Sequence, residues 1–412
     1  MRNHKKVVFI TPLYLPAVIS GSQMFVKYLA EGLVERGCNI SVITSDALTP
    51  RYWYDPFFGR KLNSSYEKIN GVSVYRLPCA QIISSISFIL ARYVHFFPKN
   101  FRNKLKVFSN GPYLLGLEKL LHKKKFDVVH CSPFPLEINA EIAECIQHLM
   151  YRPKLFITPF FHAHVTDYYN PEFQHIFDVT DTVHVISTSE KKDISASFQI
   201  ESKKFFIAPL FINTSTMRTQ KELHHDIQRA KETYRLFGRK IILFAGIKGR
   251  GKGALHVLWA VHELWLKDPS IVLIAIGSET REWNMAKQDI DGRCLIDLPY
   301  KTGRNKEELF ALSHVYCMPS ATETFGLTYL EAWHKKKPVI GADIPPVREL
   351  IVNNVGGLTV PYGDTNKLQM AITKLIQNPV LSRDLGENGY KALMKKYTIT
   401  RVLPTYLRLF NG

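Results

Sequence analysis

Short apolar runs alternate with amphipathic stretches along most of this chain. Residues 6–10 form a β-branched run that predicts a strand, and residues 22–36 carry apolar side chains at helical spacing before Gly37. Residues 40–44 form the next strand-like run. A strand, a helix and a second strand in this order make a βαβ unit, which favours a parallel sheet with helices on its faces.

The same rhythm continues and then restarts after a break. Further strands are predicted in the first half at residues 72–77, 126–130, 155–159 and 182–187. The polar stretch 213–226 interrupts the rhythm. A second series of strands follows at residues 240–245, 271–276, 294–298, 315–318, 339–342 and 357–360, with helices at residues 254–266, 307–313, 367–377 and 383–396. We therefore predict an α/β protein of two successive domains, residues 1–212 and 213–396, with a cleft between them.

The length of the chain agrees with two domains, because 412 residues exceed one ordinary hydrophobic core. No uninterrupted apolar run reaches the roughly 18 residues of a transmembrane helix. The best candidate, residues 81–97, contains Ser84, Arg92 and His95. The basic N-terminus does not indicate a signal peptide, since its apolar run is short and Pro12 follows. The six cysteines are scattered without a C-x-x-C pair, so we expect reduced, mostly buried thiols in a cytoplasmic protein.

The net charge of +18 is compatible with three anionic partners: nucleic acid, an anionic membrane face and a phosphorylated substrate. No nucleic-acid-binding motif accompanies it, so we predict no nucleic acid partner. Residues 91–126 hold nine basic residues against one acidic residue, interleaved with aromatic and apolar side chains. The basic residues are Arg92, Lys99, Arg102, Lys104, Lys106, Lys119, Lys123, Lys124 and Lys125. A basic amphipathic region of this kind can lie on an anionic membrane, and solvated lysines on normally packed helices are the alternative.

Two glutamates eight positions apart stand out in the second half. Glu323 follows the predicted strand 315–318, and Glu331 falls inside a helix-like run. In open α/β sheets ligands bind beyond the carboxyl ends of the strands. The helix start between the two glutamates offers free N–H groups and the positive end of a dipole. Alternatively, Glu331 pairs with Lys335 four residues on, and Glu323 only complements the dipole.

A glycine-rich basic turn, residues 246–253, follows the strand 240–245. Its glycines allow the backbone to approach an anion closely. Gly246, Gly251 and Lys252 nearly spell a phosphate-binding P-loop, but Gly253 occupies the place of the required Ser or Thr. We therefore do not predict a P-loop NTPase, and a merely flexible basic loop remains as the alternative.

The extended segment E-T-F-G-L-T-Y-L-E-A-W, followed by K-P-V-I-G-A, resembles the E-x7-E signature of retaining GT-B glycosyltransferases. The resemblance is to glycosyltransferase family four, the group 1 transferases. It covers the second half almost continuously and the first half in patches. It implies a GT-B fold of two Rossmann-like domains facing each other across a cleft. It also implies a last helix, within residues 397–412, that crosses back to the first domain.

The resemblance assigns roles to the residues of the E-x7-E segment. Glu331 would bind the ribose hydroxyls of a nucleotide, and Glu323 would lie beside the donor sugar. The N–H groups of Phe325, Gly326 and Leu327 would contact the sugar or the phosphates.

The resemblance also assigns a role to the basic turn. Lys252 and Gly253 match the family's K-G, where the lysine grips the donor diphosphate. Ile247 stands in place of the family's arginine, and Lys248 or Arg250 is the expected substitute.

Two segments of the first domain resemble the family more loosely. Gly21, in the turn at residues 16–23, resembles part of a G-G-x-E turn that meets the diphosphate. His162 matches a T-P-x-x-H segment in which the histidine lies beside the donor sugar, with His164 in reserve. An ordinary strand-to-helix turn and a structural histidine remain the alternatives at these places.

The sequence thus predicts a retaining, metal-independent glycosyltransferase without a cofactor. Its catalytic residues would be Glu323, His162 and Lys252. It would move a sugar from a nucleotide-diphosphate sugar to a glycan or lipid-linked hydroxyl acceptor, in surface polysaccharide or glycolipid synthesis. We expect a cytoplasmic protein, peripheral on the inner membrane face. One alternative is a sugar-nucleotide epimerase or phosphorylase on the same fold. Another is a nucleotide-sugar-binding protein that has lost its activity, which the replacement of the family's arginine by Ile247 would explain.

Overall fold

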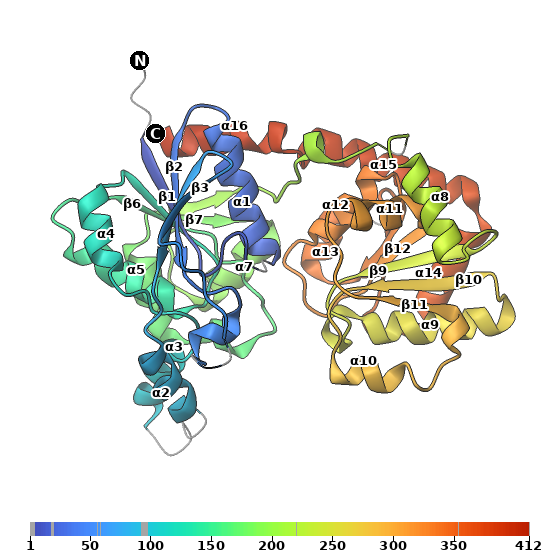
Figure 1. The fold of residues 1–412 in the computed structure, drawn as a ribbon, viewed down its shortest axis with the longest axis horizontal. Helices are drawn as coiled ribbons and strands as arrows, with labels where there is room; N and C mark the ends of the chain where they lie inside the picture. Colours follow the sequence, from blue (N-terminus) through green and yellow to red (C-terminus); the bar gives the residue numbers. More distant parts are fainter. Residues whose placement is uncertain are drawn as a thin grey trace. The chain divides into compact units, whose positions relative to one another are not determined.

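The computed structural model describes residues 5–17, 20–55, 57, 59–91, 98–219, 221–352 and 354–411. The chain divides into two compact units (Figure 1). The first contains Met1–Pro209 and Val402–Gly412, and the second contains Leu210–Arg401. The polar stretch at residues 213–226, predicted as the break between domains, therefore belongs to the second unit.

The first unit is built on an eight-stranded sheet in the order β3-β4-β2-β1-β5-β6-β7-β8. All neighbours are parallel except β3 and β4, which pair antiparallel. The strands are β1 (Lys6–Ile10), β2 (Asn39–Ser45), β3 (Tyr66–Ile69), β4 (Val72–Leu77), β5 (Val128–Cys131), β6 (Lys154–Ile157), β7 (Thr182–Val185) and β8 (Phe205–Ile207). The central strands are buried almost throughout, because helices cover both faces of a parallel sheet.

Eight α-helices accompany this sheet within the described residues. They are α1 (Gly21–Val34), α2 (Gln81–Ala91), α3 (Lys99–Phe108), α4 (Leu117–Lys124), α5 (Glu137–His148), α6 (Gln174–Val179), α7 (Thr188–Ser197) and the C-terminal α16 (Ile399–Asn411). No helix of the described part combines the length and hydropathy that are needed to cross a membrane.

The second unit has six parallel strands in the order β11-β10-β9-β12-β13-β14. They are β9 (Lys240–Ala245), β10 (Ile271–Ile276), β11 (Leu295–Leu298), β12 (Val315–Met318), β13 (Val339–Ala342) and β14 (Gly357–Val360). The helices are α8 (His224–Thr233), α9 (Ala254–Lys267), α10 (Arg281–Ala286), α11 (Arg304–Leu312), α12 (Leu327–His334), α13 (Pro345–Leu350), α14 (Thr365–Gln377) and α15 (Pro379–Lys396). The prediction of two Rossmann-like α/β domains is confirmed.

The last helix, α16, packs on the first unit although it follows the second in sequence (Figure 1). The Phe410 ring contacts Phe9 of β1 and Phe156 of β6, with ring centroids 6.0 and 5.6 Å apart. The Tyr406 hydroxyl lies 2.8 Å from Nε2 of His184. These buried contacts join the end of the chain to the first sheet, as the resemblance implied.

All six cysteines are unpaired, and all but the half-buried Cys38 are buried.

Candidate functional site

The glycine-rich turn leaves the carboxyl end of β9, the strand at the middle of the second sheet. Residues Arg250–Lys252 form a short 3-10 turn, and Gly253 opens α9 with φ +76°. A Cβ atom on Gly253 would lie 2.2 Å from the carbonyl oxygen of Pro319. The close approach of the turn to the loop after β12 therefore requires glycine at this position.

Hydrogen bonds join the two loops at this edge of the sheet. The Ala321 N–H donates to the Gly251 carbonyl at 2.9 Å, and the Ser320 hydroxyl lies within hydrogen-bond distance of the same carbonyl. The Ser320 hydroxyl also donates to the Thr322 carbonyl at 2.7 Å. Because β9 and β12 are neighbours in the sheet, these bonds hold the basic turn against the segment that carries Glu323.

The structure brings Lys252 and Glu323 together. The Lys252 Nζ lies 2.9 Å from Oε2 of Glu323, and the Thr324 N–H donates to the other carboxylate oxygen at 3.2 Å. The Glu323 side chain is 10% exposed and the Lys252 side chain 31% exposed. A partly solvated ion pair therefore stands at the start of α12, with the ammonium the more accessible partner.

The start of α12 carries backbone N–H groups that have no partner among the described residues. Gly326 precedes the helix with φ +90°, and a Cβ there would strike the Tyr329 ring at 2.4 Å. The Tyr329 ring is held by a hydrogen bond of 2.6 Å to the Met318 carbonyl. Among the described residues, the N–H groups of Phe325, Gly326 and Leu327 have no hydrogen-bond acceptor. Unpaired N–H groups at a helix N-terminus suit a phosphate or sugar oxygens.

Glu331 pairs with a different lysine from the one that its spacing suggested. The Lys306 Nζ lies 2.6 Å from Glu331 Oε2 and donates to Oε1 at 2.8 Å. The alternative of a pair with Lys335 is wrong, because the Lys335 ammonium contacts Glu307 at 2.8 Å. Lys306 lies 25 positions earlier, at the start of α11, so local spacing could not reveal it.

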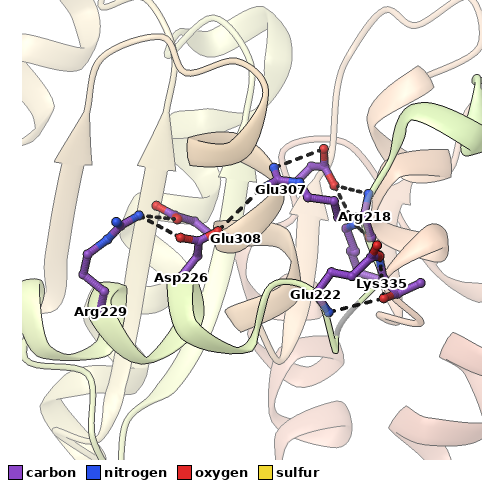
Figure 2. Close-up of polar contacts among 8 residues, drawn as sticks. Arg218, Glu222, Asp226, Arg229, Glu307, Glu308 and Lys335 are labelled. Carbon is purple, nitrogen blue, oxygen red and sulfur yellow. Dashed lines mark hydrogen bonds and ion pairs between the residues drawn. The ribbon is translucent and has the colours of Figure 1, made fainter.

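A network of charged residues around Glu307 contains Lys335 (Figure 2). Glu307 accepts a hydrogen bond from the Arg218 N–H at 2.9 Å and pairs with the buried Lys335. Burial alone would raise the pKa of Glu307, but Lys335 and the Arg218 N–H hold the pKa below its usual value. Asp226 lies between Arg218 and Arg229 (Figure 2) and pairs with them at 3.4 and 3.0 Å, respectively. The network fixes the polar stretch before α8 to α11 and α12, next to the Lys306–Glu331 pair.

Lys248 and Arg250, the expected substitutes for the family's arginine, lie in different surroundings. The fully buried Lys248 ammonium pairs with Asp297, approaches Glu279 at 3.4 Å and donates to the Leu298 carbonyl at 3.1 Å. It is therefore occupied by carboxylates beside β11. The Arg250 residue is exposed on the 3-10 turn, and no ion pair forms at its guanidinium within the described residues. Arg250, rather than Lys248, is thus accessible to an anion.

Gly21 and His162 belong to the first unit. Gly21 is the first residue of α1, where Ser20 and Gln23 form the helix cap. Two residues of its turn, Val18 and Ile19, lie outside the described residues, as does Arg92 of the basic region. The half-buried His162 packs edge-on against Tyr168 with ring centroids 5.5 Å apart, and His164 is exposed.

Glu190 supports the loop that carries His162, a role that the sequence reasoning did not anticipate. Its two carboxylate oxygens accept the N–H groups of Phe161 and Ile186, each at 2.7 Å. Burial raises the pKa of Glu190 to about 7. Phe160, two residues before His162, has φ +53°, which is uncommon for a bulky residue. The only available signal was a glutamate in the first turn of the helix that follows the buried strand β7.

Comparison with known proteins gives a consistent picture across both units. The chain matches the family described as "Glycosyl transferases group 1" over residues 226–392 and the family described as "Glycosyltransferase Family 4" over residues 19–216. An uncharacterized glycosyltransferase of Methanocaldococcus jannaschii is 22% identical over 402 residues, which cover 95% of this chain and 94% of that protein. The O-antigen chain mannosyltransferase C of Escherichia coli is 26% identical, over 47% of this chain and 52% of that protein.

Solved structures match the whole chain. The structure of Anabaena HepE in complex with UDP and glucose has a TM-score of 0.73 at 12% identity, covering 99% of this chain and 100% of that one. Sucrose-phosphate synthase from Thermosynechococcus elongatus has a TM-score of 0.74 at 16% identity, covering 99% and 98%. At these identities the likeness concerns the fold. The two family matches, over residues 19–216 and 226–392, place this chain among the group 1, family four glycosyltransferases, and the solved structures show the GT-B fold.

Proposed function

We propose that this glycosyltransferase moves a sugar from a nucleotide-diphosphate sugar to a hydroxyl acceptor, with retention at the anomeric carbon. The observation that carries the proposal is the Lys252–Glu323 pair beside the open N-terminus of α12. A cation and a row of free N–H groups at one strand edge form the kind of site that stabilises a departing diphosphate.

In this proposal Lys252 binds the diphosphate and takes up the negative charge that develops as the sugar leaves. The N–H groups of Phe325, Gly326 and Leu327 share that charge, and the exposed Arg250 adds to it. Because the chain's own groups supply the positive charge, the proposed reaction is metal-independent and uses no cofactor. Glu323, freed from Lys252 by the incoming phosphate, faces the sugar.

Glu331 is proposed to accept the ribose hydroxyls of the donor. A carboxylate can accept two hydroxyl hydrogens, one at each oxygen. Lys306 holds the carboxylate in place for this task. Assigning Glu331 to the nucleotide leaves Glu323 as the single carboxylate for the sugar, which differs from the paired carboxylates of glycoside hydrolysis.

We also propose roles for two residues of the first unit, Gly21 and His162. Gly21 brings backbone N–H groups of the α1 start to the diphosphate, and His162 contacts the donor sugar. Glu190 positions the His162 loop, because one carboxylate oxygen accepts the Phe161 N–H and the other accepts the Ile186 N–H.

The acceptor is proposed to be a glycan or a lipid-linked molecule of a surface polysaccharide or glycolipid pathway. Two relatives with partial coverage support this class: the O-antigen mannosyltransferase of Escherichia coli and a lipopolysaccharide core mannosyltransferase of Rhizobium leguminosarum. We also propose that the protein is cytoplasmic and binds an anionic membrane surface. The basic residues of α3 and α4 support this, because the cytoplasmic leaflet is negatively charged.

A thermal-shift screen of nucleotide sugars tests the donor, since a bound donor raises the unfolding midpoint. The stabilising donor is then incubated with candidate acceptors, and the anomeric configuration of the product is read by NMR. We expect retention, with full activity in a metal chelator. Inversion, or a strict requirement for a metal ion, would contradict the mechanism.

The same assay separates the alternative functions. An epimerase or phosphorylase would convert the donor without an alcohol acceptor. A binding protein that has lost activity would be stabilised by the donor and would turn over none of the acceptors.

A further inference from the structure

Helix α2 packs with its polar side inward. Ser84 and Ser87 are buried against the first unit. Six large apolar side chains of the same helix face solvent, with exposed fractions from 38% at Leu90 to 77% at Ile82. They are Ile82, Ile83, Ile86, Phe88, Ile89 and Leu90. A helix on the surface of a globular protein normally has the opposite arrangement. The exposed apolar side chains of α2 therefore suit contact with an apolar partner.

Specific contacts fix this orientation of α2. The Gln81 side-chain amide donates to the Tyr52 carbonyl at 2.7 Å, and the Ser85 hydroxyl donates to the Tyr54 carbonyl at 2.6 Å. The Phe88 ring contacts the Tyr54 ring with centroids 5.0 Å apart. Rotating the helix to bury its isoleucines would break these contacts, so its exposed apolar face belongs to the folded unit.

A basic helix lies beside α2. Figure 1 shows α2 and α3 next to one another at one end of the first unit. Helix α3 buries Leu105 and Val107 and exposes both basic and aromatic side chains, Lys99, Phe101, Lys104, Lys106 and Phe108. Neither helix contains an acidic residue. Exposed apolar side chains thus adjoin uncompensated positive charge.

We propose that the α2–α3 face docks on an anionic lipid bilayer. The isoleucines of α2 enter the boundary between headgroups and acyl chains, and the lysines of α3 contact lipid phosphates. With eleven residues, α2 is about 16 Å long, roughly half the hydrocarbon thickness, so it lies in the plane of the membrane. This inference rests on the proposed function, in which the partner is an anionic membrane surface, and it names the helices that contact that surface.

Charge distinguishes the bilayer from a second copy of the chain as the occupant. Two copies pairing through this face would bring two sets of α3 lysines together without an acidic residue on either helix to neutralise them. An anionic bilayer matches both properties of the face, the apolar surface and the positive charge.

Sedimentation with vesicles tests the proposal on the full chain. Vesicles of phosphatidylcholine with 30% phosphatidylglycerol are compared with pure phosphatidylcholine. We expect the triple variant Ile82→Ser/Ile86→Ser/Ile89→Ser to lower the partition coefficient about tenfold or more. The triple variant Lys99→Gln/Lys104→Gln/Lys106→Gln should remove the preference for phosphatidylglycerol and its dependence on salt.

The matched control is Leu266→Ser/Met285→Ser/Met370→Ser, which removes three equally exposed apolar side chains from the second unit. Its partition coefficient should equal that of the unchanged protein. Circular dichroism confirms that each variant is folded. Unchanged vesicle binding by the isoleucine variant would overturn the proposal. A dimer that this variant dissociates in sedimentation equilibrium would also overturn it, by identifying a second copy as the occupant.

Donor binding separates this inference from the proposed function. The isoleucine variant should keep the thermal shift with the nucleotide sugar, because α2 lies outside the second unit. If no nucleotide sugar stabilises the chain while vesicle binding still requires α2, the proposed function fails and the docking helix stands. If a nucleotide sugar stabilises the chain but the α2 variant binds vesicles as well as the unchanged protein does, the docking proposal fails and the proposed function stands.

Discussion

At the scale of single residues, two lysines and both glutamates of the candidate site are already paired within the chain. Lys252 contacts Glu323 and Lys306 contacts Glu331. A partly exposed pair of this kind adds little to stability, about 0–1 kcal/mol. In the proposed mechanism the donor phosphates would therefore replace Glu323 at Lys252 at small cost, which suits a site that must exchange its ligand.

Lys252→Met should lower the rate of sugar transfer about 10²- to 10³-fold, because it removes the cation that the proposed mechanism assigns to the developing diphosphate charge. Stability should change little, since the pair is partly solvated. Steady-state kinetics with the best donor measures the effect. Lys391→Met, at an exposed position on α15, is the control and should keep full activity. A Lys252→Met enzyme with unchanged rate would remove this lysine from the mechanism.

Ile247→Arg should raise the turnover rate, by about tenfold, by restoring the arginine that the family carries. Ile247 is 58% exposed, so a longer side chain requires no repacking of the core. Ile247→Lys should give a smaller gain, because lysine lacks the two-pronged geometry of the guanidinium. Equal rates for all three proteins would mean that Lys252 and Arg250 already provide the necessary charge.

At the scale of elements, the site depends on how closely two loops approach at the ends of β9 and β12. Gly253 faces the Pro319 carbonyl, and the Gly251 carbonyl accepts the bonds from the facing loop. Glycine is required at only one of these two positions. Nothing lies within 4 Å of a Cβ built on Gly251.

Gly253→Ala should lower the free energy of unfolding of the second unit by about 1–3 kcal/mol, since it adds both a clash and strain at positive φ. It should also weaken donor binding by moving Lys252. Gly251→Ala is the matched control and should change neither quantity measurably. Urea unfolding and the donor-induced thermal shift provide the two measurements. Equal stability of the two variants would show that the loops separate without cost.

At the scale of the whole molecule, a buried polar chain joins the C-terminal helix to the first sheet. Nε2 of His130 lies 2.6 Å from the Thr158 hydroxyl, which lies 2.8 Å from Nδ1 of His184. The Tyr406 hydroxyl of α16 completes the chain at His184. Burial lowers the pKa of His130 to about 3 and that of His184 to about 4. Both imidazoles are thus neutral in the folded unit at neutral pH.

The two histidines should therefore contribute progressively less to the stability of the first unit as the pH falls from about 6.5 towards 4. In this range the unfolded chain binds protons at these histidines and the folded unit does not. The stability difference between the unchanged protein and His184→Gln should shrink by about 2 kcal/mol between pH 7.5 and pH 5.

Urea unfolding followed by circular dichroism measures this difference. Taking the difference cancels the titration of Glu137, Glu141 and Glu190, whose pKa values burial raises to about 8, 8 and 7. His164→Gln, at an exposed position, is the control. A difference that stays constant with pH would mean that His184 accepts a proton inside the fold.

Much of the architecture could be predicted because the central strands are buried on both faces. Strands β9, β10, β12, β13 and β14 coincide with the predicted residue ranges, since a buried parallel strand is a continuous apolar run. The three-residue β8 carries too short a pattern to predict. The glutamate pair was visible because E-x7-E is local in sequence. Its partners Lys252 and Lys306 lie 71 and 25 positions away.

The sequence by itself therefore determined the two α/β domains, the family and the residues that gather at the end of β12. These properties follow from local periodicity and from spacing along the chain. Only the tertiary structure decided which charges pair, that Lys248 is buried while Arg250 is accessible, and that α2 turns its isoleucines outward. The reason is physical, because burial and ion pairing depend on which distant segments contact each other. The periodicity of one segment does not reveal which segments pack against it.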